Sequence, residues 1–136
     1  MRYLKILCVL AVIVFVSGCS IEPEPINFGK DHCVYCKMTI ADPKYGAELV
    51  TKKGRIYKFD AIECMLPYMK ENADTEFGHT MAVAYDKPQS LQKVESLYFV
   101  KNAHFKSPMG KNLAAFVKQP QEFESMTWTQ LTETFY

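Results

Sequence analysis

The sequence has little excess charge of either sign, since 16 Lys and Arg residues stand against 15 Asp and Glu residues. Proteins that bind nucleic acid or an anionic membrane surface directly usually concentrate positive charge, so no nucleic acid partner is expected and no basic membrane patch is present. The sequence also lacks the paired carboxylates, activated serine or histidine–acid arrangement that would indicate catalysis. We therefore expect a binding protein and not an enzyme.

The N-terminus has the layout of a secretory signal peptide. Basic residues precede an almost wholly apolar run over residues 6–16, which is too short to span a bilayer. The pair Ser17-Gly18 directly before Cys19 resembles a bacterial lipobox, which predicts removal of residues 1–18 and attachment of lipid to the Cys19 sulfur. An uncleaved signal, or one cleaved without lipidation, is the alternative.

Lipid on Cys19 would hold the domain at a membrane surface, because several acyl chains together give stable anchoring. Residues 19–30 contain prolines and charges that favour an extended tether, so we expect the folded domain to begin near Asp31. Loss of residues 1–18 leaves 14 basic and 15 acidic residues. The predicted location is the cell envelope, on the periplasmic or another extracytoplasmic face of a membrane.

Short apolar patterns and turn residues predict the strands and helices of the mature chain. Gly54 indicates a hairpin turn, and Asp60 with Glu63 three residues further on is typical of a helix start. The expected elements are strands at 47–51, 55–59, 80–85 and 97–101, a helix from 61 to about 70 that Pro67 kinks or shortens, and a second helix capped by Thr127 with Gln130.

The second half of the chain repeats the first half in outline. Met38 leads into the segment 45–50, and Met109 leads into the similar segment 112–117, each followed by a lysine-containing turn, aromatic residues and a helix. This repeat predicts an α+β fold of two ββα-type half-units, at about 31–90 and 91–136. Met38 and Met109 would then occupy matching places and could face each other across a shared cleft.

Sulfur and nitrogen donors are concentrated in the segment Asp31-His32-Cys33-Val34-Tyr35-Cys36-Lys37-Met38. Thiolate and thioether are soft ligands that select Cu(I), whereas zinc prefers thiolate and imidazole and makes little use of methionine. A second segment contains His104 and places Met109 between Pro108 and Gly110, which should expose that methionine on a loop. The methionines therefore favour copper over zinc.

Cys8 would leave with the signal peptide and Cys19 would carry the lipid, so three cysteines remain: Cys33, Cys36 and Cys64. An odd number of cysteines cannot be fully paired within the chain. Because Cys-x-x-Cys also occurs in redox enzymes and zinc sites, an envelope thiol–disulfide oxidoreductase and a zinc-binding structural module using Cys33 and Cys36 remain as alternatives. Neither alternative explains the methionines. Cys64 lies between apolar residues of the expected helix, which favours a buried, inert thiol, with a ligand role as a minor option.

Three segments resemble the NosL family of lipoprotein copper chaperones, which is associated with maturation of nitrous-oxide reductase. They are Tyr35-Cys36-Lys37-Met38, the segment Lys58-Phe59-Asp60 that leads into a helix, and Pro108-Met109-Gly110 ahead of Ala114-Ala115-Phe116. The similarity includes the lipobox and is specific at the Tyr-Cys-x-Met and Met-Gly positions.

The resemblance implies a fold of two similar ββαβ units, also found in organomercurial lyase. It further implies that Cu(I) is bound and passed to the copper centres of nitrous-oxide reductase, in denitrification, through a membrane-associated assembly complex. Cys36, Met38 and Met109 match the family's motif, whereas Cys33 is not a fixed feature of that family. Our hypothesis is a low-coordinate Cu(I) site formed by the Cys36 thiolate and the thioethers of Met38 and Met109. Cys33, His32 and His104 are further candidate ligands.

Overall fold

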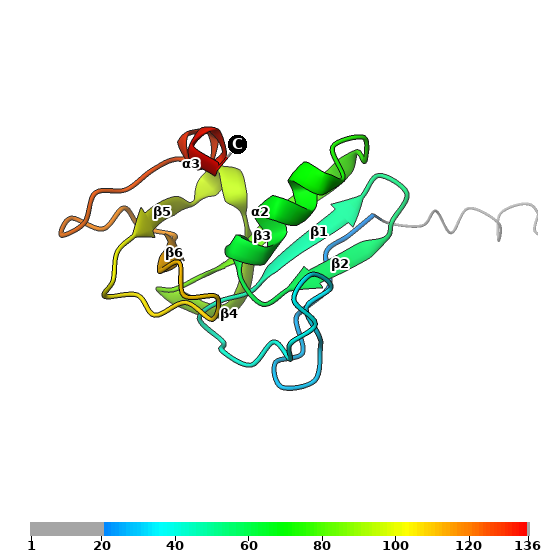
Figure 1. Ribbon diagram of the computed structural model, residues 1–136, viewed down its shortest axis with the longest axis horizontal. Helices are drawn as coiled ribbons and strands as arrows, with labels where there is room; N and C mark the ends of the chain where they lie inside the picture. Colours follow the sequence, from blue (N-terminus) through cyan, green and yellow to red (C-terminus); the bar gives the residue numbers. More distant parts are fainter. Residues whose placement is uncertain (1–20, 136) are drawn as a thin grey trace, which may run out of the picture.

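The computed structural model describes residues 21–135 (Figure 1). The strands are β1 (Ala47–Thr51), β2 (Ile56–Phe59), β3 (Phe77–Ala84), β4 (Lys87–Lys93), β5 (Tyr98–Lys101) and β6 (Leu113–Phe116). The helices are α2 (Ile62–Glu71), the short 3-10 helix η1 (Val94–Ser96) and α3 (Trp128–Phe135). The predicted α+β class is confirmed. Within residues 21–135, none of these helices has the length and apolar character needed to cross a membrane.

Four antiparallel strands form the larger sheet, in the order β2-β1-β3-β4. β1 and β2 are the hairpin predicted around Gly54, whose φ of 83° is one that glycine adopts readily. The inner strand β1 is buried along its whole length because α2 packs on one face of the sheet and the N-terminal segment, residues 21–30, lies on the other. Since α2 begins directly after β2, its first turn lies at the end of the hairpin's second strand.

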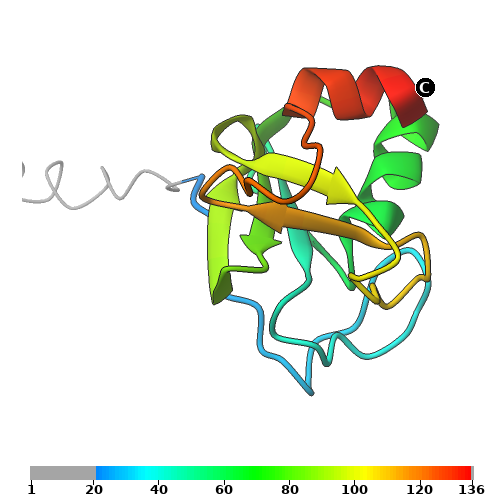
Figure 2. The same cartoon turned by 90° about the vertical axis from the view of Figure 1, so that its left-hand side faces the viewer.

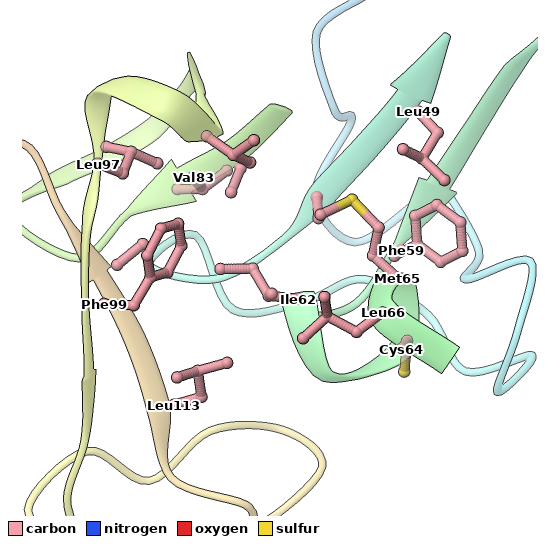
Figure 3. Close-up of a cluster of buried hydrophobic side chains, with 14 of the residues drawn as sticks. Leu49, Phe59, Ile62, Cys64, Met65, Leu66, Val83, Leu97, Phe99 and Leu113 are labelled. Carbon is pink, nitrogen blue, oxygen red and sulfur yellow. The ribbon is translucent and has the colours of Figure 1, made fainter. Parts of the chain in front are cut away.

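One apolar core joins the larger sheet, α2 and the second half of the chain (Figure 3). Leu49 and Phe59 of the sheet lie beside Met65 of α2, while Ile62 points toward Phe99 and Leu113 of the smaller sheet. Burying each large apolar side chain stabilises the fold by about 1.5–3 kcal/mol. Because α2 contributes to both sides of this core, its position is fixed by both halves of the chain.

β5 and β6 form a separate two-stranded antiparallel sheet, and α3 follows them (Figure 2). An antiparallel strand pair followed by a helix therefore occurs in each half. α3 has the predicted capping box, since Thr127 N donates to Gln130 Oε1 (2.9 Å) and Gln130 N donates to Thr127 Oγ1 (3.4 Å). In the first half β3 follows the helix and completes the ββαβ order, whereas the described part of the second half ends with α3.

One local expectation was wrong, and one strand was missed. The N-cap of α2 is Ala61 and not Asp60, and alanine has no side-chain acceptor for a cap bond. The Glu63 carboxylate accepts hydrogen bonds from a distant loop. β4 was not expected, since Lys87–Lys93 is polar and contains Pro88. Pairing with β3 makes this segment a strand, and proline is tolerated because β4 lies at the edge of the sheet. Pro67 lies inside α2 without ending it.

The folded domain already includes residues 21–30, where we expected a tether before Asp31. Three hydrogen bonds join this segment to the sheet: Glu24 N to Glu48 Oε1 (2.9 Å), Lys58 Nζ to Pro25 O (3.0 Å), and His79 Nε2 with Ile21 O (2.8 Å). Ile26 is buried beside Gly46. The predicted signal peptide and the predicted anchor at Cys19 lie outside the described residues.

Candidate metal centre

Three cysteine sulfurs meet where the loop before β1 touches the first turn of α2. Cys33 and Cys36 come from that loop and Cys64 from the helix, and their sulfur atoms all lie within 4.8 Å of one another. Cys33 is 1% exposed and Cys64 is 0% exposed, whereas Cys36 is half-buried. All three thiols are free. The group can therefore hold a metal ion whose outward-facing ligand would be Cys36.

Backbone hydrogen bonds fix the shape of the cysteine loop. Cys33 N donates to Met38 O (2.8 Å), which closes the loop, and Val34 N donates to Lys58 O (2.9 Å), which attaches it to β2. Lys37 has a left-handed φ of 67°, an unusual conformation for a residue other than glycine, asparagine or aspartate. The loop is thus held by contacts outside itself, which place Cys33 facing inward.

Cys64 belongs to this group, although its sequence context predicted an inert thiol. It is buried as expected and belongs to the same core cluster as Met65, but in Figure 3 its sulfur points in the opposite direction from the Met65 side chain. Sequence patterns miss this because the contact depends on the loop docking against β2, which brings Cys33 next to α2. The available indication was the odd number of cysteines outside the predicted signal and anchor, which leaves at least one thiol free or bound to something.

The three thiols differ in how readily they ionise. The pKa of Cys33 is lowered to about 4, chiefly because the Cys64 thiol donates a hydrogen bond to it, with further help from backbone N–H groups such as Cys36 N at 3.4 Å. The same hydrogen bond, together with burial, raises the pKa of Cys64. Burial raises the pKa of Cys36. One thiolate is therefore stabilised inside the cluster, and thiolate is the form that binds metals.

Met38 and Met109 are surface residues and do not belong to the apolar core. Met38 is 54% exposed and Met109 is 38% exposed, in contrast to the buried Met65 and Met81. Met38 follows Cys36 by two residues, and its backbone N–H lowers the pKa of that thiol, so the start of the thioether side chain lies near the cluster. Exposed methionine on loops is unusual for a packing residue. Whether the two methionines face each other across a cleft stays a prediction.

The loop that carries Met109 is attached to α2 one residue before Cys64. Glu63 Oε1 accepts hydrogen bonds from Ser107 Oγ (2.6 Å) and Leu113 N (3.0 Å), on either side of Met109. Two segments that are far apart in sequence therefore reach the same end of α2, one with two cysteines and the other with a methionine.

The histidines lie outside the cysteine group. His32 is exposed and pairs with Thr39 in a β-bridge, and His104 packs its ring against Phe105 and Phe123. Among the described residues, the group of His, Cys and acidic side chains positioned to hold a metal contains the three cysteines and no histidine. The suggested ligand roles of His32 and His104 stay predictions.

The comparisons with known proteins agree with this architecture. The crystal structure of the copper chaperone NosL from Shewanella denitrificans matches with a TM-score of 0.68 at 14% identity, covering 83% of this chain and 97% of that chain, which shows a shared fold. No protein with a curated description matches the sequence. The family model described as NosL matches residues 25–126, a range that includes part of the N-terminal segment, the three cysteines of the cluster, and Met38 and Met109. The chain belongs to the NosL family.

Proposed function

We propose that this protein is a lipid-anchored Cu(I) metallochaperone that delivers copper for assembly of the copper centres of nitrous-oxide reductase. The observation that carries the proposal is the meeting of three cysteine sulfurs within 4.8 Å. Soft sulfur ligands favour Cu(I) over the harder divalent metals. The structural neighbour is described as a copper chaperone, and membership of the NosL family supports a carrier rather than an enzyme.

The burial of the sulfurs suggests how copper is held and released. Cys33 and Cys64 would retain the ion from inside, whereas Cys36 and Met38 lie at the solvent side, where a partner's ligands can reach the metal. An incoming sulfur would displace the outer ligands first and the buried thiolates last. The Met109 thioether would complete the outer part of this ligand set.

The same geometry weakens the two alternatives. In a thiol–disulfide oxidoreductase the accessible cysteine has the lowered pKa. Here the lowered pKa belongs to the buried Cys33, and burial raises the pKa of the more accessible Cys36. A structural zinc site needs four ligands, and the described cluster offers three cysteines without a histidine.

The lipobox at Ser17-Gly18-Cys19 supports anchoring to a membrane of the cell envelope, with the domain on its periplasmic or extracytoplasmic side. We infer that the recipient is nitrous-oxide reductase, reached through its membrane-associated assembly complex. Deletion of the gene should then leave the reductase protein present but deficient in copper.

Anaerobic titration of the purified protein with Cu(I), against a competing chromophoric chelator, tests copper binding. We expect one tightly bound ion per chain, and a loss of affinity of about tenfold or more, or ~1.4 kcal/mol, for Cys36→Ser and for Met38→Ala. Met69→Ala, which changes a half-buried methionine outside the cluster, is the matched control. Affinity unchanged in both ligand variants would contradict the proposed site, and tight zinc binding without copper binding would favour the structural module.

A further inference from the structure

Glu63 is a buried carboxylate in the first turn of α2, next to Cys64. It is 3% exposed, and among the described ion pairs none involves it. Burying a carboxylate costs free energy unless hydrogen bonds satisfy it. Those bonds come from a single loop: Ser107 Oγ (2.6 Å) and Leu113 N (3.0 Å) donate to Oε1, and Lys111 N (3.4 Å) donates to Oε2.

The loop bound by Glu63 is the one that presents Met109. Ser107 Oγ also accepts a hydrogen bond from Asn112 N (2.9 Å), and Ser107 O accepts one from Gly110 N (3.0 Å), so the segment folds back on itself around Met109. Gly110 and Asn112 both have left-handed φ angles, of 73° and 60°. Glycine and asparagine tolerate such angles, so the shape of the loop depends on its internal hydrogen bonds and on those to Glu63.

We propose that Glu63 is a positioning residue that couples the Met109 loop to the cysteine cluster and so sets the place of the Met109 thioether relative to the bound Cu(I). The inference rests on the proposed copper site. Because Glu63 and Cys64 are adjacent in the same helix, the carboxylate places the loop relative to the one cysteine that comes from a rigid element. Without the carboxylate, the loop loses three hydrogen bonds and the thioether loses its defined position.

A double-mutant cycle tests this coupling in the full chain, purified in detergent. Glu63→Ala and Met109→Ala should each weaken Cu(I) binding by roughly 10–100-fold, the range seen when groups that orient a ligand are removed. The double variant should be no weaker than Met109→Ala alone, since both changes remove the same ligand. Glu63→Gln should restore most of the affinity, because its amide oxygen can still accept the bonds from Ser107 and Leu113.

A measurement without copper separates this inference from the proposed function. In the metal-free protein, the NMR order parameter of the Met109 methyl group should fall in Glu63→Ala and be retained in Glu63→Gln. If Glu63→Ala does not fold, Ser107→Ala replaces it, because it removes the hydroxyl that joins the loop to the carboxylate.

Independent, additive losses in the cycle would overturn the coupling, since they would indicate a general effect of Glu63 on the fold. Wild-type affinity in Met109→Ala, with copper still bound through the cysteines, would overturn the inference and leave the proposed function standing. An unchanged order parameter of the Met109 methyl group in metal-free Glu63→Ala would also overturn it, whatever the copper titration shows.

Discussion

Cys64 combines two properties that substitution can separate, a sulfur that can bind metal and a thiol hydrogen that is donated to Cys33. Cys64→Ser keeps a hydrogen-bond donor but removes the soft ligand, whereas Cys64→Ala removes both. We expect both variants to bind Cu(I) about tenfold more weakly or worse. In the metal-free protein the pKa of Cys33 should stay low in the serine variant and rise in the alanine variant, because the hydrogen bond from Cys64 is the largest cause of its lowering.

Chelator competition measures the affinities, and the ultraviolet absorbance of the thiolate, followed against pH, measures the pKa of Cys33. Cys64→Ser with wild-type affinity would remove Cys64 from the ligand set. A low pKa of Cys33 in both variants would show that backbone N–H groups alone stabilise the thiolate.

Glu48 makes the stability of the fold depend on pH. Its side chain is fully buried under the N-terminal segment, and Oε2 lacks a hydrogen-bond partner. Burial raises the pKa of Glu48 from 4.5 to about 7. Because the pKa of Glu48 is higher in the folded state than in the unfolded state, the folded protein binds more protons between pH 4.5 and about 7. The stability that protonated Glu48 contributes is therefore lost as pH rises from about 4.5 toward 7.

Glu48→Gln should therefore gain roughly 1–3 kcal/mol relative to wild type as pH rises across this window. Urea unfolding of both proteins at several pH values between these limits measures the effect. The cysteines titrate in both proteins, so the difference between the two curves isolates Glu48. A constant difference at all pH values would contradict the raised pKa.

The N-terminal segment behaves as an element of the sheet although it has no regular secondary structure. It buries Ile26, donates a hydrogen bond to Glu48 and accepts one from Lys58. A chain that begins at Asp31 should be less stable than one that begins at Ile21 by roughly 2–5 kcal/mol, from the lost apolar burial and hydrogen bonds.

The midpoint of urea unfolding, compared between the two chains, tests this expectation. Ile26→Ala in the longer chain should reproduce part of the loss, since it removes the apolar contact and keeps the backbone hydrogen bonds. Equal midpoints for the two chains would show that the segment is a tether after all.

Across the whole molecule, the sequence predicted elements whose determinants are local. Gly54 between two short β-prone runs was sufficient for the hairpin, and Thr127 with Gln130 was sufficient for the start of α3. β4 could not be predicted because its polar residues become a strand only by pairing with β3.

In the candidate site, too, features set by neighbouring residues could be predicted and features set by distant contacts could not. The soft donors around Cys36 and Met38 are contiguous in sequence, so their shared chemistry was visible before the fold. The place of Cys64 and the bonds of Glu63 depend on contacts between segments that are distant in the chain, and the sequence pattern assigned both residues other roles. The docking of Glu24 onto Glu48, across 24 positions, was hidden for the same reason.

The attachment of the N-terminal segment determines which end of the domain lies near the predicted lipid anchor. Ile21 lies beside Gly78, close to Lys52 at the hairpin turn, whereas Cys33 and Cys64 lie at the opposite end of β2, where α2 begins. Only Ser20 separates Ile21 from Cys19. Lipid on Cys19 would therefore hold the hairpin turn near the bilayer and direct the cysteine end outward, so that a recipient would approach copper from the aqueous side of the membrane.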